Sequence, residues 1–146
     1  MDMTTTLVDH TFRKDVRRCF ERQTFAIPAR WLDDRRGSEL FEEITELPEY
    51  DPTRTETKLL EANGPAFAAA VGPKRAVIEF GSGSSTKTPH LLKAIDPAAY
   101  VPIDISGEFL EHSASQLQDE FPDLPILPVE ADFMKRVELP EVVADM

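Results

Sequence analysis

The chain has 146 residues, of which 41% are apolar and 29% are charged, and its formal net charge is −11. This length and composition indicate one globular domain of ordinary size. No window approaches the roughly 18 apolar residues that a membrane-spanning helix needs, and an acidic surface repels nucleic-acid phosphates. We therefore expect neither a membrane nor a nucleic acid as a partner, and we interpret the net charge as a solubility feature.

The N-terminus and the cysteine content indicate a cytoplasmic protein. Residues 1–6 lack a basic stretch followed by an apolar core, so we expect no signal peptide. The single Cys19 excludes an internal disulfide and fits a reducing compartment. We expect this cysteine to be half-buried on a helix rather than catalytic, and we assign no metal ligands in this sequence.

Apolar residues at three- and four-residue spacing predict two helices in the first 50 residues. The first helix should run over residues 7–23. The second is short and should be capped by Ser38. It should end before Pro48, because proline cannot donate a hydrogen bond into a helix.

A third helix is predicted to begin at Thr53, which forms a capping-box pattern with Glu56. The Asn63-Gly64-Pro65 sequence should interrupt this helix, and a further helical segment should reach Val71. We therefore expect the first half of the chain to form a helical cap, with its helices over roughly residues 7–72, and we assign residues 1–72 to it.

The pattern changes in the second half, where short apolar runs alternate with helical stretches. We expect helices at residues 85–95 and from Ser106 onward, and strands at residues 76–80, 100–105 and 126–129. This alternation predicts βαβ units with a parallel sheet, and so an α/β, Rossmann-like domain over residues 73–146. Pro102 should place the second strand at an edge or in an unpaired position.

The predicted sheet is small. A doubly wound sheet has roughly five to seven strands, so three strands would leave one edge and much apolar surface uncovered. We expect either a fragment of a larger domain or a chain that a partner completes.

A glycine loop, Glu79-Phe80-Gly81-Ser82-Gly83-Ser84, follows the first predicted strand. Glycines allow a tight turn there, which brings backbone N–H groups and the next helix to the strand end, where open α/β sheets bind ligands. A dinucleotide fingerprint needs a third glycine or alanine where this chain has Thr86, which disfavours a nicotinamide-dependent oxidoreductase. The acid-x-Gly-x-Gly order instead fits an S-adenosylmethionine (SAM) loop, in which Glu79 would orient the loop or reach the methionine end of the cofactor.

Two acidic positions in the later strands extend this interpretation. Asp104 lies 23 positions after Gly81 (104 − 81), close to the roughly 20-residue spacing at which a carboxylate meets ribose hydroxyls. Its alternative role is a helix cap or a solvated strand end. Asp132 could accept a hydrogen bond from the adenine amino group and Phe133 could pack on the ring, or they could be a turn acid and a core residue. Lys87 is either a contact to the cofactor carboxylate or a solvated lysine.

The sequence resembles the N-terminal part of the bacterial L-histidine Nα-methyltransferases of ergothioneine biosynthesis, over nearly the whole chain. The carrying segments are Gly37-Ser38-Glu39-Leu40-Phe41, Leu47-Pro48-Glu49-Tyr50-Asp51-Pro52-Thr53-Arg54-Thr55-Glu56, Glu79-Phe80-Gly81-Ser82-Gly83-Ser84-Ser85-Thr86-Lys87-Thr88, Pro102-Ile103-Asp104 and Asp132-Phe133. The segment over residues 47–56 is the most specific, because general methyltransferases do not carry it.

The resemblance implies a SAM-dependent methyltransferase fold, preceded by a helical cap that contributes to the substrate pocket. It implies an enzyme that moves three methyl groups, one at a time, from SAM to the α-amine of histidine and so makes hercynine. Tyr50 would lie near the reacting amine and position it through its hydroxyl group, with no general base assigned, unless it is only a half-buried loop residue. The residues expected to contact SAM are Glu79, Gly81, Ser82, Gly83, Lys87, Asp104, Asp132 and Phe133.

Two departures from the family pattern matter. Asp33 stands two positions after Trp31, where the family often has a tyrosine that helps to bind histidine. This changes imidazole recognition or moves it elsewhere. The family proteins are also longer, and their later part supplies further strands and substrate-binding groups, so we expect the chain alone to lack full activity. One alternative is a non-catalytic SAM-binding fragment or scaffold that a separate chain, such as the missing C-terminal half, would complete. The other is a methyltransferase for another amino acid or amine.

Overall fold

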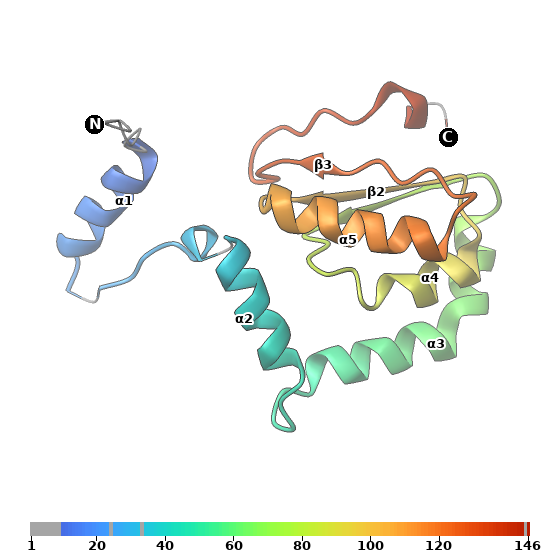
Figure 1. Cartoon of the computed structure of the whole chain (residues 1–146), viewed down its shortest axis with the longest axis horizontal. Helices are drawn as coiled ribbons and strands as arrows, with labels where there is room; N and C mark the ends of the chain where they lie inside the picture. Colours follow the sequence, from blue (N-terminus) through green and yellow to red (C-terminus); the bar gives the residue numbers. More distant parts are fainter. Residues whose placement is uncertain (1–9, 24, 33, 145) are drawn as a thin grey trace, which may run out of the picture.

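The computed structural model describes residues 10–23, 25–32, 34–144 and 146. Helices occupy the first half and a small α/β unit the second, as Figure 1 shows. The elements in chain order are α1 (His10–Phe20), η1 (Ala29–Trp31), α2 (Arg35–Thr45), α3 (Pro52–Val71), β1 (Ala76–Phe80), α4 (Thr88–Ile95), β2 (Ala99–Asp104), α5 (Gly107–Glu120), β3 (Val129–Glu130) and η2 (Glu141–Val143).

The three strands form one parallel sheet in the order β1-β2-β3, which confirms the predicted α/β class and the incomplete parallel sheet. The side chains of β2 alternate between two apolar clusters on the two faces of this sheet. On one face Tyr100 packs with Leu92 of α4 and Leu117 of α5. On the other face Val101 packs with Val143 of the C-terminal segment. The sheet therefore has helices on one face and an irregular segment on the other.

The sequence predicts that Pro102 lies at an edge or in an unpaired position. The edge is wrong, because β2 is the central strand, but Pro102 is indeed unpaired on the side that faces β3. Tyr100 N–H donates to Pro125 O, and Asp104 O accepts from Ala131 N–H, so the backbone N–H and C=O groups of the even-numbered residues of β2 point toward β3. Pro102 is one of these even-numbered residues. It lies opposite the stretch between the isolated Tyr100–Ile126 bridge and the short β3, where no ladder pair forms. The N–H group that proline lacks therefore leaves no gap in the pairing.

The N-terminus of α2 also differs from the prediction. Asp34, not Ser38, is the N-cap, and its side chain accepts a hydrogen bond from Gly37 N–H at 2.8 Å. A Cβ atom on Gly37 would come within 1.5 Å of Leu32 O, so only glycine allows this first turn to lie against the preceding backbone. An aspartate is as good a cap as a serine, and it stands four residues earlier.

The start of α3 lies one residue before the predicted capping box. Pro52 occupies the first helical position, where its missing N–H group costs nothing and its fixed φ suits the helix. Asp51 takes the cap position, and its carboxylate accepts a hydrogen bond from the Thr55 hydroxyl at 3.0 Å. The Thr53 side chain therefore makes no cap, and the capping-box prediction is wrong.

The predicted break at Asn63-Gly64-Pro65 is absent, since α3 continues through it to Val71. Proline inside a helix costs roughly 3 kcal/mol, so packing must offset this cost. α3 packs along α4, and Gly64 is buried at their contact. A Cβ atom on Gly64 would lie only 2.8 Å from Ala94 Cβ. Close approach of the two helices therefore outweighs the helix-breaking sequence.

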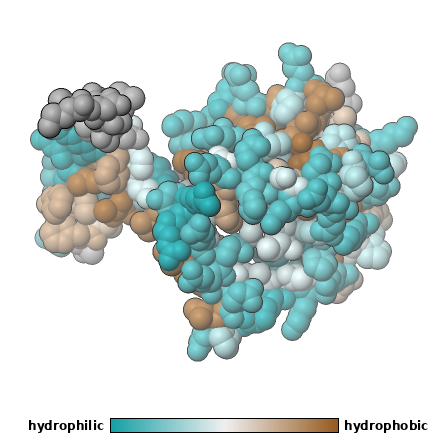
Figure 2. Space-filling model, viewed as in Figure 1, coloured by the Kyte–Doolittle hydropathy of each residue, from teal (hydrophilic) through white to brown (hydrophobic). Residues whose placement is uncertain are grey.

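Helix α1 stands apart from the α/β unit in Figure 1, and it packs mainly against η1. Trp31 donates from Nε1 to Asp15 at 2.9 Å, and its ring meets Phe12 edge-on at 5.1 Å. Cys19 is 6% exposed and so more buried than expected. Figure 2 shows apolar side chains gathered on this part of the surface. The predicted start of this helix, residues 7–9, lies outside the described residues.

The division into a cap and a cofactor domain at residues 72 and 73 stays a prediction. Its position agrees with the interval between α3 and β1, although the packing of α3 on α4 crosses it. None of the helices in the described ranges is both long and apolar enough to cross a membrane.

Substitution of Gly64 by alanine tests the contact between α3 and α4. Alanine favours an exposed helix by about 1 kcal/mol over glycine, but overpacking costs about 1–3 kcal/mol. We expect Gly64→Ala to lower the free energy of unfolding, measured by urea denaturation followed by circular dichroism.

The matched control is the double variant Gly64→Ala/Ala94→Gly, which moves the methyl group from one helix to the other. We expect the double variant to be more stable than the sum of the two single effects predicts. Simple additivity of the single effects, or a stabilised Gly64→Ala variant, would contradict a tight contact at this position.

Candidate functional site

The glycine loop turns sharply over the end of the sheet. Gly81 and Gly83 have φ values of 71° and 53°, in the region that glycine enters without strain. The N–H groups of Gly81 and Ser82 both point to Ile103 O of β2, at 2.8 and 3.3 Å. The loop is therefore tied to the neighbouring strand, and side chains at the two glycine positions would strain it.

Asp104 joins this loop to the helix that follows β2. One carboxylate oxygen accepts a hydrogen bond from Gly83 N–H at 3.0 Å, and the other accepts one from Ser106 N–H at 3.0 Å. An ionised carboxylate has roughly four lone-pair sites, so capacity remains for further donors. The structure thus brings together the glycine loop and the acid that sequence spacing paired with it. Ser106 stands at the N-cap of α5 as predicted, although its side chain makes no cap bond.

Glu79 points into the protein and not toward an open site. Its Oε2 atom accepts hydrogen bonds from Tyr100 OH at 2.6 Å and from Thr88 Oγ1 at 2.8 Å. These two donors lie on β2 and at the start of α4. The geometry therefore fits the role of orienting the loop, which was one of the two roles expected for Glu79.

Ser82 contributes an unsatisfied polar atom to the loop. The residue is 7% exposed, and its hydroxyl oxygen has no hydrogen-bond partner within the described part of the chain. A buried polar group without a partner costs roughly 1–3 kcal/mol. A polar group of a ligand at the loop could supply the missing bond.

Asp132 and Phe133 follow β3, as predicted. Asp132 accepts a hydrogen bond from Met134 N–H at 3.1 Å and forms an ion pair with Lys135 at 3.1 Å. The Lys135 ammonium group and the Met134 N–H hold the pKa of the Asp132 carboxyl below its usual range.

The Phe133 ring is 45% exposed and packs edge-on against Phe80 at 5.9 Å. A Cβ atom on Gly81 would lie 3.7 Å from this ring. Phe133 is therefore beside the glycine loop with one part of its ring open to solvent, and it is not a core residue.

Lys87 stands at the N-cap of α4, one residue before the helix and not in its first turn. Its ammonium group forms an ion pair with Glu56 of α3. The structure thus shows Lys87 bound to a helix of the first half of the chain, and a contact to the cofactor carboxylate stays a prediction.

Tyr50 lies in the turn between α2 and α3, where it is half-buried. Its ring meets Phe41 edge-on at 6.0 Å, and its N–H donates to Leu47 O. The Arg54 guanidinium group donates to Leu47 O at 2.9 Å and to Pro48 O at 2.7 Å, so it holds the turn that carries Tyr50. The described contacts of Tyr50 are within this turn and with α2, and not with the glycine loop. Asp33, which stands where the family often has a tyrosine, lies outside the described residues.

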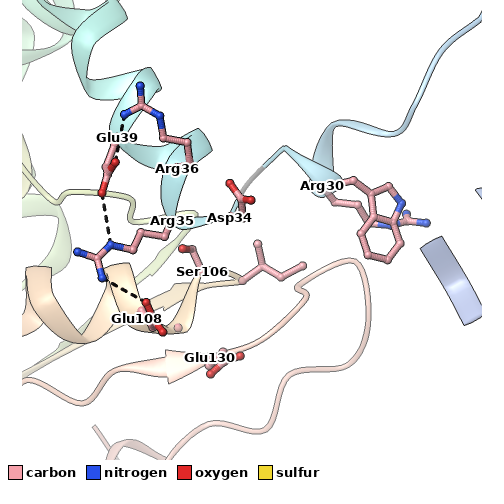
Figure 3. Close-up of a pocket in the computed structure, with 11 residues that line it drawn as sticks. Arg30, Asp34, Arg35, Arg36, Glu39, Ser106, Glu108 and Glu130 are labelled. Atoms are coloured by element: carbon pink, nitrogen blue, oxygen red, sulfur yellow. Dashed lines mark hydrogen bonds and ion pairs between the residues drawn. The ribbon is translucent and has the colours of Figure 1, made fainter. Parts of the chain in front are cut away.

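A groove of about 750 Å³ opens between the start of α2 and the junction of β2 and α5. Figure 3 shows ion pairs along one wall, from Arg36 through Glu39 and Arg35 to Glu108, with N–O distances of 3.2 to 3.5 Å. Bonds from Arg36 and Arg35 hold the pKa of the Glu39 carboxyl below its usual range. Of these charged residues only Glu39 lies in a segment of the family resemblance, and the sequence analysis assigned none of them to the site.

The groove is also lined by Ile105, Ser106 and Gly107. Because these residues directly follow Asp104, their position in the sequence is a signal that could have located this part of the groove. A Cβ atom on Gly107 would come within 2.2 Å of a carboxylate oxygen of Glu130. The Glu130 carboxylate therefore occupies the space that a side chain at position 107 would take at the N-terminus of α5.

Comparison with known proteins agrees with this geometry. Residues 12–145 match the family described as histidine-specific, SAM-dependent methyltransferase. The chain is 36% identical to the histidine N-alpha-methyltransferase of Mycolicibacterium smegmatis, over 89% of this chain and 42% of that protein. It is also 36% identical to the histidine N-alpha-methyltransferase of Mycobacterium tuberculosis, over 88% of this chain and 41% of that protein. Ergothioneine biosynthesis protein 1 of Neurospora crassa is 37% identical over 62% of this chain and 11% of its own length.

The chain thus spans about two fifths of the length of the two mycobacterial relatives. The family match covers both the helical half and the α/β half, including the Tyr50 turn and the glycine loop. The resemblance inferred from residues 47–56 and 79–88 is confirmed, and the chain belongs to the family of histidine-specific, SAM-dependent methyltransferases.

Proposed function

We propose that this protein methylates the α-amine of L-histidine, with SAM as the methyl donor, and yields hercynine. One observation carries the proposal: in a chain of this family, the Asp104 carboxylate binds the Gly83 N–H of a loop that also buries the unpaired Ser82 hydroxyl group. The chain would supply the cofactor loop and the Tyr50 turn. Its lone Cys19 supports a cytoplasmic location as part of the same proposal.

The residues at the loop fit SAM in three respects. The Asp104 carboxylate has free lone pairs for a ribose diol. The Ser82 hydroxyl group has no partner among the described residues, and a polar end of the cofactor could provide one. The open part of the Phe133 ring lies beside Gly81, where it could contact a flat heterocycle. A dinucleotide fits less well, because Thr86 is exposed and does not form the close helix-strand contact of that fingerprint.

The reaction asks mainly for positioning. When bound, SAM supplies an electrophilic methyl group on a sulfonium, so the protein must align the neutral amine lone pair with it. The Tyr50 hydroxyl group would accept a hydrogen bond from the amine and orient it. Arg54 would keep Tyr50 in place, since two of its nitrogen atoms bind successive carbonyl groups of the turn. We assign no general base among the described residues.

A second candidate is methylation of another amino acid or amine. Asp33 favours it, because a carboxylate at a usually aromatic position would change how the imidazole ring is recognised. A third candidate, SAM binding without catalysis, would leave the loop geometry unchanged. Incubation with SAM and a panel of amino acids, followed by mass spectrometry for mono-, di- and trimethylated products, separates these candidates.

Calorimetry with SAM tests the cofactor site. Asp104→Asn removes the negative charge from the predicted ribose contact, and hydrogen bonds to charged groups contribute about 1.5–3 kcal/mol. We therefore expect the dissociation constant for SAM to rise about 10- to 100-fold.

The matched control is Asp119→Asn, which removes the same charge from an exposed position on α5. We expect it to leave SAM affinity within twofold of the unchanged protein, which is on the order of measurement error. If both substitutions raised the dissociation constant for SAM equally, the effect of Asp104 would come from the net charge of the protein and not from a direct contact with SAM.

Tyr50→Phe tests whether the turn between α2 and α3 takes part in binding the amino-acid substrate. Loss of one neutral hydrogen bond, worth about 1 kcal/mol, should raise KM for histidine about fivefold while leaving the dissociation constant for SAM unchanged. Hercynine formation measured by mass spectrometry at varied histidine gives this value. The assay should include the chain alone and the chain extended by any coding sequence that follows Met146 in its gene.

Accumulation of hercynine in either form of the protein supports the proposal. Methylation of a different amine, with histidine left unmodified, would favour the second candidate. SAM binding without any methylated product in the extended form would favour the third.

A further inference from the structure

A tyrosine of β2, Tyr100, lies buried beside the glycine loop and bonds to residues on both sides of it. Tyr100 is 0% exposed, and its ring belongs to the apolar cluster that includes Leu92 and Leu117. A buried hydroxyl group must find hydrogen-bond partners or destabilise the protein. The hydrogen-bond partners of the Tyr100 hydroxyl group therefore indicate which parts of the structure it holds together.

The Tyr100 hydroxyl group connects three segments around the loop. It donates to Glu79 Oε2, at the end of β1, at 2.6 Å. It lies 3.3 Å from the Ser85 hydroxyl group, at the C-terminal side of the loop. The Thr88 hydroxyl group, at the start of α4, donates to the same Glu79 oxygen at 2.8 Å. One polar cluster thus spans the strand before the loop, the loop and the helix after it.

Ser85 is the loop residue that most needs such support. Its φ is 56°, in the left-handed region, where a residue with a side chain is strained and persists only when its surroundings hold it. Its N–H group donates to Ser82 O at 2.9 Å, so its conformation sets the position of the buried Ser82. Gly81 and Gly83 share the left-handed geometry but need no side-chain support.

The hydroxyl group of Tyr100 is protonated at neutral pH and is therefore a hydrogen-bond donor. Burial, and after it the charge of Glu79, raises the pKa of Tyr100 above its usual range. The cluster therefore keeps a donor, Tyr100, facing an acceptor, Glu79.

We propose that Tyr100 is a positioning residue of the cofactor loop. Its hydroxyl group holds Glu79 and Ser85 so that the Ser82 hydroxyl and the Gly83 N–H are already in place before SAM binds. The inference rests on the proposed function, because it takes SAM as the ligand of the loop. A loop that is ordered in advance loses less conformational freedom on binding.

Tyr100→Phe tests this role, because phenylalanine keeps the ring in the apolar cluster and removes only the hydroxyl group. We expect the dissociation constant for SAM, measured by calorimetry, to rise about 5- to 30-fold, the factor that corresponds to the ordering of one further residue. Backbone amides of residues 79–88 should exchange hydrogen faster in the free variant, and the difference should shrink when SAM is saturating. In the methylation assay, KM for SAM should rise and KM for the amino acid should not.

A second substitution separates loop positioning from general stability. In the Tyr100→Phe background, Ser85→Gly relieves the left-handed strain at position 85. We therefore expect the dissociation constant for SAM to fall at least about threefold relative to Tyr100→Phe alone, on the order of the effect of one backbone restriction. The matched control is Ser113→Ala, which removes a similarly buried hydroxyl group whose hydrogen bond, among the described residues, is to Phe109 O within α5. We expect this control to leave both SAM affinity and amide exchange of the loop unchanged.

Wild-type affinity and unchanged loop exchange in Tyr100→Phe would overturn the inference, as would an equal loss of affinity in Ser113→Ala. If Tyr100→Phe does not fold, Ser85→Ala takes its place, because it removes the loop partner of the tyrosine and is expected to have the same effects at smaller size. If the unchanged protein does not bind SAM, the proposed function fails. The amide exchange of residues 79–88 in the free variants still decides whether Tyr100 orders the loop.

Discussion

The candidate site depends on the Asp104 carboxylate at the end of β2. One of its oxygens binds the Gly83 N–H of the glycine loop, and the other binds the Ser106 N–H at the start of α5. Hydrogen bonds to an ionised acceptor are stronger than neutral ones, so one side chain fastens the loop after β1 to the helix after β2. Backbone bonds from Gly81 and Ser82 to Ile103 O place the loop beside β2, and Asp104 determines its orientation there.

Helix α3 connects the two halves of the site. Near its N-terminus Arg54 binds the carbonyl groups of the turn that carries Tyr50. Half a turn later Glu56 pairs with Lys87, which follows the glycine loop. Further along, the buried Gly64 brings the whole helix against α4. The most specific segment of the sequence thus makes two contacts, one to the turn that carries Tyr50 and one to Lys87 beside the glycine loop.

The fold class was predictable because the signals for it are local. Apolar runs and helical periodicity located β1, β2 and the α-helices of the described residues, since burial of one face imposes those periods on any sequence. The third strand is shorter than predicted, because β3 is Val129–Glu130 and shares only Val129 with the predicted strand at 126–129. The errors occurred where a partner element decides. Pro102 is compatible with a central strand only because its side of β3 forms no ladder pair there. Pro65 is compatible with a continuous α3 only because α4 packs against that helix.

The same division holds for the site. The sequence by itself determined the glycine loop, the acid 23 positions after its first glycine, and the family, because these depend on residue type and spacing along one chain. Only the tertiary structure decided that Glu79 faces inward to Tyr100, that Lys87 meets Glu56, and that charged residues of α2 line a groove beside Ile105. These contacts join residues that are 21 to 73 positions apart, as in the bonds of Glu79 and Arg35. Unlike the spacing from Gly81 to Asp104, these pairs belong to no sequence motif, so the packing of whole elements brings them together.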